Sequence, residues 1–86
     1  MDEIIIEFIR ERLVVTGKGT DRIASSALVA LYIDWYEAKT ARPIRRRSAA
    51  LAIADAARNY HDPDTSAVFA SMTSQGITFY TGVKLA

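Results

Sequence analysis

The chain has 86 residues, of which half are apolar and 24% are charged, and it contains no cysteine and a single histidine. This length fits one small domain and excludes a two-domain enzyme, because a second hydrophobic core has no room to form. The composition is that of a folded domain and excludes an intrinsically disordered chain. Without cysteine, disulfides and thiolate zinc sites are also excluded, so packing has to supply the stability.

The charged residues are distributed unequally, although eleven basic and ten acidic residues give a net charge of only +1. Residues 1–41 carry seven acidic and five basic side chains, whereas residues 42–86 carry six basic and three acidic ones. Such an asymmetry predicts that a surface formed by the second half meets a polyanion or an acidic partner.

The sequence shows no sign of export or membrane insertion. No apolar run approaches the roughly 20 residues that span a bilayer. Asp2 and Glu3 stand where a secretory signal would be basic. We therefore expect a cytoplasmic protein without a membrane partner.

Helical spacing dominates the first 40 residues. An amphipathic helix is predicted over residues 2–15 from the spacing of Ile5, Phe8, Ile9 and Leu13. The glycine-rich stretch at 16–21 ends it, and residues 22–24 are a candidate short strand. A second helix is predicted over residues 26–40, with Ser25 or Ser26 as its N-cap. Its apolar stripe consists of Leu28, Leu31, Tyr32 and Trp35.

Pro43 separates the second helix from a third, because the residue before a proline leaves the helical region of backbone conformation. The third helix is predicted over residues 46–60, and its core face consists of Ala49, Ile53, Ala56 and Tyr60. Residues 67–84 favour strands on either side of a short loop and predict a β-hairpin. The tip of that hairpin is expected at Ser74, Gln75 and Gly76.

The order of these elements predicts the fold class. Helix, short strand, helix, proline turn, helix and hairpin is the order of a winged helix-turn-helix domain. We therefore expect an α+β fold with three helices followed by a C-terminal β-hairpin wing. Residues 1–86 are expected to form this single domain, and the sequence contains no internal repeat.

The residues that catalysis requires are missing or isolated. The chain has one histidine, His61, and no serine in a nucleophile-elbow motif. Asp62 and Asp64 beside it are interpreted as a solvated turn, because the segment has too few ligands for a cation loop. We therefore predict no enzyme activity, no metal and no cofactor. The stretch 17–20 lacks the spacing of a phosphate loop, so Lys18 is expected at most as an auxiliary phosphate contact.

Arginines concentrate around the start of the third helix, where guanidinium forks suit phosphate oxygens and guanine edges. In a helix-turn-helix, the second helix of the motif enters the major groove and the flanking turn contacts the DNA backbone. We therefore predict that the chain binds double-stranded DNA through this helix, with thymine methyls and phosphates as contacts of its outer face. The expected contact residues are Arg42, Arg45, Arg46, Arg47, Ala50, Leu51, Ala54, Arg58, Ser74 and Gln75.

A plain solvated surface is the alternative interpretation of these arginines. Cations at a helix N-terminus are unfavourable, because the helix dipole is positive at that end. An arginine cluster in this position is easier to explain if an anion completes it, so we favour nucleic-acid contact. The hairpin tip has no lysine or arginine and is expected to offer only hydrogen bonds.

Four stretches carry a further pattern: residues 23–28, then Tyr32 with Trp35, Pro43 with Ile44, and residues 79–85. Together they resemble the C-terminal winged-helix module of primase-helicase replication proteins of phages, plasmids and poxviruses. The matching positions are Phe8, Leu28, Tyr32, Trp35, Pro43, Tyr80, Gly82, Val83 and Leu85. Arg45 and Ala49 depart from the pattern, standing where the family usually has a serine or threonine and a bulky aromatic residue.

The resemblance implies a module that binds DNA near a replication origin and helps to place a primase or helicase domain. A small transcriptional regulator of the same fold remains an alternative. A protein-protein adaptor is another, in which the arginines dock an acidic partner. Because one short recognition helix binds DNA weakly, a second copy of the chain is a further expected partner.

Overall fold

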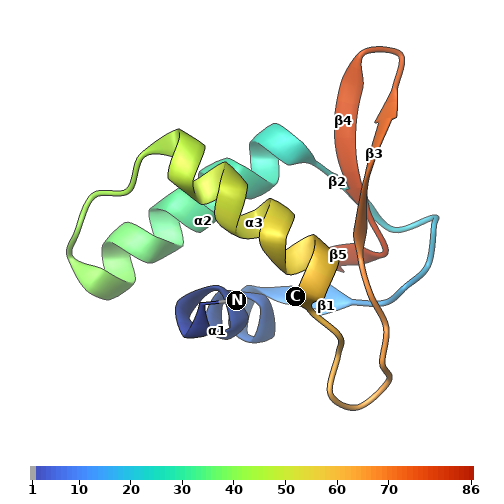
Figure 1. Cartoon of the computed structure of the whole chain (residues 1–86), viewed down its shortest axis with the longest axis horizontal. Coiled ribbons are helices and arrows are strands. Elements are labelled where there is room, and N and C mark those ends of the chain that lie inside the picture. The colour runs from blue at the N-terminus through green and yellow to red at the C-terminus, as the bar shows by residue number, and fades with distance from the viewer. Residues whose placement is uncertain (1) are drawn as a thin grey trace.

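Three helices and two antiparallel sheets make up the computed structural model, which describes residues 2–86 (Figure 1). The predicted α+β class is confirmed. None of the described helices is long and apolar enough to cross a membrane. The elements are α1 (Glu3–Arg12), β1 (Leu13–Val15), β2 (Arg22–Ala24), α2 (Ser25–Thr40), α3 (Arg46–Asn59), β3 (Ala70–Ser74), β4 (Ile77–Thr81) and β5 (Val83–Leu85).

Both sheets join the end of the chain to the segment between α1 and α2. The larger sheet has the order β2-β4-β3, with Tyr80 of β4 opposite Ile23 on one side and Ser71 on the other. The smaller sheet pairs β1 with β5, and Val15 lies opposite Val83. The tip of the β3–β4 hairpin extends away from the helices, and the C-terminal end of α3 lies near the base of the hairpin (Figure 1).

One hydrophobic cluster connects the helices and the sheets. The ring of Phe8 on α1 lies 4.9 Å from that of Tyr32 and 5.3 Å from that of Trp35, both on α2. Burial among these rings raises the pKa of Tyr32 to about 12. On the sheet side, the rings of Phe69 and Tyr80 meet edge to face at 5.7 Å. Aromatic pairs of this kind stabilise a core beyond the area they bury.

The predicted core faces are confirmed with one exception. Leu31 is only half-buried, whereas Val29 is buried with 4% of its surface exposed. Because α2 packs against α1, α3 and β4, its buried face is wider than a single stripe. The predicted core residues that are buried are Ile5, Phe8, Ile9, Leu13, Leu28, Tyr32, Trp35, Ala49, Ile53, Ala56 and Tyr60.

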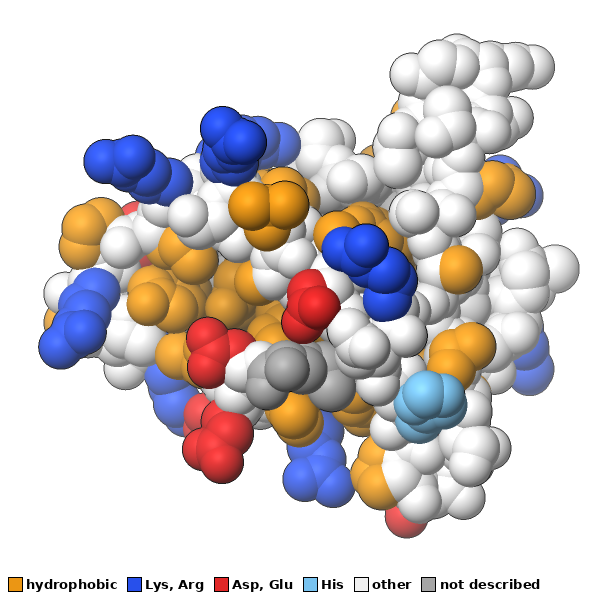
Figure 2. Space-filling view, in the orientation of Figure 1, with side chains coloured by type: hydrophobic (Ala, Val, Ile, Leu, Met, Phe, Trp, Pro, Cys, Tyr) orange, Lys and Arg blue, Asp and Glu red, His pale blue; other side chains and the backbone are white. Residues whose placement is uncertain are grey.

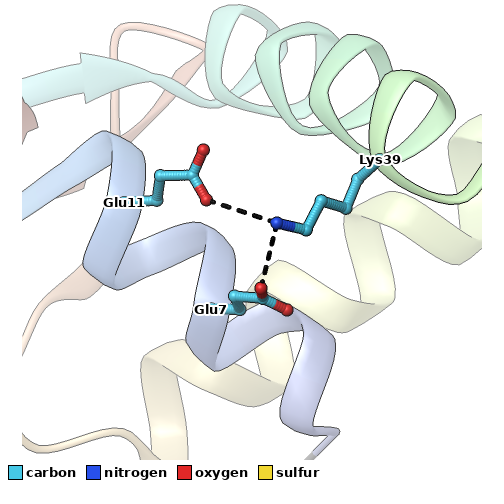
Figure 3. A network of polar contacts seen from close by, with 3 residues as sticks. All are labelled: Glu7, Glu11 and Lys39. Carbon is cyan, nitrogen blue, oxygen red and sulfur yellow. Dashed lines mark ion pairs between the residues drawn. The ribbon is translucent and has the colours of Figure 1, made fainter.

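A surface ion pair connects α1 to α2 (Figure 3). The Lys39 Nζ lies 3.1 Å from Glu7 Oε1 and 3.9 Å from Glu11 Oε2. The hydrogen bond to Glu7 and the two negative charges raise the pKa of Lys39 above its usual value. Exposed pairs contribute little to stability, because solvent and salt screen the charges. This contact therefore adds little to the packing of α1 against α2.

The prediction of a helix over residues 2–15 is wrong at its C-terminal end. The helix α1 ends at Arg12, and the next three residues form β1 against β5. They alternate buried, exposed and buried, and their two valines favour extended backbone. The strand that pairs with β1 lies at the far end of the chain. Helical periodicity in the local sequence does not reveal that pairing, so the predicted helix is three residues too long.

The prediction of a hairpin over residues 67–84 is also too long. β3 begins at Ala70 and β4 ends at Thr81, joined by a two-residue turn. Residues 67–69 precede the strand, since Ser66 adopts a left-handed conformation with φ 62° and turns the chain. The last predicted strand residues leave the hairpin and belong to β5 in the other sheet.

Gly82 is the point at which the chain passes from one sheet to the other. Its φ of 79° lies in the region that favours glycine. The Gly82 N–H donates to the Asp21 carbonyl at 2.8 Å, and its own carbonyl accepts from the N–H groups of Thr16 and Gly17 at 2.8 and 3.0 Å. One residue therefore connects the β1–β2 loop to the β4–β5 junction.

Neither Ser25 nor Ser26 caps α2, contrary to the prediction. The N-cap residue is Ala24, and no side chain hydrogen-bonds to the first turn. Ala24 is also the last residue of β2, so the strand runs directly into the helix and leaves no loop for a capping hydroxyl. The predicted short strand at 22–24 is present, and the helices predicted over 26–40 and 46–60 differ from α2 and α3 by one residue each.

Gly82→Ala is expected to destabilise the fold by about 1–3 kcal/mol, the usual cost of a strained backbone conformation. A Cβ at this position would also lie 2.9 Å from the Val68 carbonyl oxygen. Urea denaturation followed by circular dichroism measures the loss. The control is Gly19→Ala, because a Cβ there meets nothing within 4 Å. Equal losses in the two variants would contradict this account of Gly82.

Candidate nucleic-acid interface

The face that α3 buries defines the face that it exposes. Ala49 and Ala56 are completely buried, and Ile53 is 2% exposed. With 3.6 residues per turn, the opposite side carries residues at i, i+4, i+7 and i+11. This outer stripe consists of Arg47, Leu51, Ala54 and Arg58. It has an exposed arginine at each end and an apolar middle, in which Leu51 is 59% exposed.

The turn between α2 and α3 is anchored at both ends. Ala41 closes α2 with φ 57°, and its N–H donates to the Glu37 carbonyl at 3.0 Å. The Ile44 N–H lies 3.4 Å from Glu37 Oε2, and the Ile44 side chain packs against the core. Arg42 and Arg45 are therefore exposed side chains on an ordered turn.

The N-terminus of α3 is strongly positive. Arg45 is the N-cap residue, and its carbonyl accepts from the Ala49 N–H at 3.0 Å. Arg46 and Arg47 follow as the first helical residues, with no acidic side chain and no capping side chain in the first turn. The unpaired N–H groups and the positive end of the helix dipole lie beside these guanidinium groups. The potential here favours an anion.

In the part of the chain that the structure describes, no carboxylate forms an ion pair with the arginines of this region. Within residues 2–86, the ion pairs all belong to Lys39. Asp55, the acidic residue of α3, accepts instead from Asn59 Nδ2 at 2.9 Å. Figure 2 shows the basic side chains along the edge formed by α3 and the preceding turn, with apolar surface between them. These arginines are therefore available to pair with an external anion.

Two grooves lie on the side of α3 that faces the hairpin, each with a volume of about 410 Å³. The first is lined by Ser25, Ser26, Val29, Arg46, Ala50, Gly76, Ile77 and Thr78. The second is lined by Ala54, Ala57, Arg58, Ala70 and Ser71. Arg46, at the start of α3, therefore lines the first groove, and Arg58, near its end, lines the second. The hairpin supplies uncharged walls to both.

The hairpin tip is exposed and carries no charge. Gln75 and Gly76 have φ values of 52° and 77°, as in the type I′ turns that join twisted strands. Ser74 is the last residue of β3. The projecting end of the hairpin is white in Figure 2, without basic or acidic side chains. It can donate and accept hydrogen bonds but offers no attraction for phosphate at a distance.

The structure brings together only part of the predicted contact set. Arg46, Ala50, Ala54 and Arg58 line the two grooves. Arg42, Arg45, Arg47 and Leu51 lie on the adjoining turn and outer stripe, and Ser74 and Gln75 lie at the hairpin tip. Lys18 is exposed in the β1–β2 loop, a different element from those that form the grooves.

Sequence reasoning missed Ser25, Ser26 and Thr78 as groove residues. The sequence predicts one of the two serines as a helix cap, yet both line a groove with Arg46 and the hairpin. No local signal identifies them, because the groove exists only once β2 pairs with β4 and places the start of α2 beside the hairpin.

The Asp62 carboxylate organises the turn that follows α3. Its Oδ1 accepts from the N–H groups of Asp64 and Thr65 at 2.8 and 3.0 Å. These hydrogen bonds hold the pKa of Asp62 below its usual value. Among the residues that the structure describes, no group of three or more His, Asp or Glu side chains is arranged to hold a metal ion.

Comparison with protein-family models, curated proteins and solved structures finds no match to this chain. The assignment of a function therefore rests on the surface chemistry of α3 and its neighbours. That surface combines unpaired arginines, two shallow grooves and a neutral hairpin.

Replacing Arg46 or Arg47 by glutamine is expected to stabilise the fold by about 0.3–1 kcal/mol at low salt, because each change removes a cation from the positive end of the helix dipole. Arg58→Gln, in the last turn of α3, is the matched control and should destabilise by a similar amount. Urea denaturation at low and high salt measures both, and salt should reduce both differences. Destabilisation by Arg46→Gln or Arg47→Gln together with stabilisation by Arg58→Gln would disprove this account of the helix terminus.

Proposed function

We propose that the chain is a winged helix-turn-helix domain that binds duplex DNA, with α3 as the recognition helix in the major groove. The observation that carries this proposal is the unpaired arginine surface of α3 beside a projecting hairpin. Because Arg46 and Arg47 sit at the helix end that disfavours cations, their position costs stability. An anionic ligand explains why they stand there.

The sheet topology supports the winged-helix assignment. The strand β2, directly before α2, pairs with β4, the second strand of the hairpin that follows α3. A winged helix has the same arrangement, with α2 and α3 as the helix-turn-helix and the hairpin as the wing. The smaller β1–β5 sheet is an addition to this plan.

The dimensions of α3 suit the major groove of DNA. Its 14 residues extend about 21 Å at 1.5 Å per residue. A helix with side chains is about 10–12 Å wide, and the major groove is about 12 Å wide. Arg46 and Arg58 are separated by about 18 Å along the axis, which is about five base steps at 3.4 Å. The short side chains of Ala50 and Ala54 allow the helix to approach the bases closely.

Each part of the surface has a proposed role. Arg42 and Arg45 on the turn contact phosphates, and Arg46, Arg47 and Arg58 contact phosphates or guanine edges at the two ends of α3. Ser74 and Gln75 on the hairpin hydrogen-bond to the sugar-phosphate backbone. Lys18 is an auxiliary phosphate contact. We propose a binding module and not an enzyme, with no cofactor.

A protein adaptor is the second candidate. Leu51, 59% exposed between arginines, is also what an interface with an acidic and partly apolar protein surface would contain. In that case the arginines would engage carboxylates rather than phosphates. Duplex binding at low salt separates the two candidates.

The biological setting that we propose is replication of a mobile element, with transcriptional regulation as the alternative. It rests on the sequence resemblance to primase-helicase modules and implies a primase or helicase domain, or a second copy of the chain, as partner. A neighbouring primase or helicase gene would support replication. A position next to a promoter that the protein represses would support regulation.

The affinity for duplex DNA is expected to fall steeply with salt, because each phosphate contact releases counterions. The double variant Arg46→Ala, Arg47→Ala should reduce the slope of log K against log salt by about 2 units. Fluorescence anisotropy with a labelled random duplex measures both slopes.

The matched control removes two positive charges elsewhere, in Arg12→Ala, Lys84→Ala. These exposed residues lie at the end of α1 and on β5 rather than on α3. The control should retain the slope of the unmodified chain. If no duplex binds at low salt, the proposal of DNA binding fails and the adaptor takes its place.

A further inference from the structure

The middle of the outer stripe of α3 has no side chain that hydrogen-bonds to a base edge. Between Arg47 and Arg58, the positions of the stripe are occupied by Leu51 and Ala54, and Ala50 lies on the hairpin side of Leu51. Their side chains contain only carbon and hydrogen. Of the neighbouring polar side chains, Ser48 is exposed about one turn before Leu51. Asp55, one turn after it, is already hydrogen-bonded to Asn59. The contacts that Leu51 and Ala54 themselves make with a base edge therefore have to be apolar.

Leu51 is placed to make such a contact. It is 59% exposed, and the alanines on its hairpin side are short and half-buried. The leucine therefore stands above the surrounding surface, between two arginines that would hold the helix against phosphates. A single exposed leucine is ordinary on a protein surface. Its position at the centre of a basic stripe is the informative feature.

The major groove presents one apolar group, the C5-methyl of thymine. Cytosine presents hydrogen at the same carbon, unless it is methylated there. A leucine flanked by alanines can distinguish the methyl from hydrogen by van der Waals contact and burial, without a hydrogen bond.

We propose that Leu51, with Ala50 and Ala54 beside it, reads the C5-methyl groups of pyrimidines in the major groove. The domain then prefers thymine over uracil and 5-methylcytosine over cytosine in otherwise identical duplexes. This inference rests on the proposed function, since it requires α3 to lie in the major groove.

The test compares duplexes of two helical turns that differ only at the pyrimidine C5 position. One pair contains alternating adenine with either thymine or uracil, and the other is a mixed sequence with either cytosine or 5-methylcytosine. The methylated member of each pair should bind more tightly, by about fourfold for each methyl contacted, the factor that corresponds to burying one CH₂ group.

Variants at position 51 assign the preference to this side chain. Leu51→Ala should bind both members of each pair equally, and Leu51→Met should retain the preference because it keeps a long apolar side chain. All three residues are good helix formers, so α3 remains intact. The control is Leu85→Ala on β5, which removes a leucine that is 57% exposed away from α3. It should leave the preference unchanged.

The outcomes separate this inference from the proposed function. Salt-dependent binding that is equal for methylated and unmethylated duplexes overturns the reading by Leu51 and leaves DNA binding in place. A preference that persists in Leu51→Ala overturns the assignment to this residue, because DNA shape would then carry it. Absence of binding to every duplex at low salt overturns the inference together with the proposed function.

Discussion

The burial of Ala49, Ile53 and Ala56 against α1 and α2 is the contact on which the candidate site depends. Small side chains at 49 and 56 let the backbone of α3 approach its neighbours closely, which fixes the rotation of the helix about its axis. Because the angle between any two residues around a helix axis is fixed, burying one face also determines which residues form the outer stripe. As a result, Arg47, Leu51 and Arg58 face solvent.

The net charge of +1 is the sum of acidic and basic residues that have different roles in the structure. Several carboxylates act within the fold: Glu7 and Glu11 contact Lys39, Glu37 accepts from the turn before α3, and Asp62 organises the turn after it. The arginines around α3 have no such use within the described residues. A protein that places cations at the unfavourable end of a helix gives up stability there, as functional surfaces commonly do.

The hairpin complements this basic surface by its shape rather than by its charge. Gly82 turns the chain out of β4, so that β5 can pair with β1 while the hairpin stays in the larger sheet. The hairpin then lies beside α3 and supplies the neutral walls of both grooves. In the function that we propose, long-range attraction comes from the helix and its turn, and the hairpin adds short-range contacts.

Local sequence determined the buried faces of the three helices and the clustering of arginines before α3, because helical periodicity and charge are properties of neighbouring residues. The core face that the sequence predicts for α3 is confirmed, since Ala49, Ile53 and Ala56 are buried. Only the tertiary structure decided that α1 stops at Arg12, that α2 starts without a capping serine, and that Ser25 and Ser26 line a groove. Each of these depends on pairing between β1 or β2 and strands at the far end of the chain, and a partner so distant in sequence leaves no periodic signal at the residues it constrains.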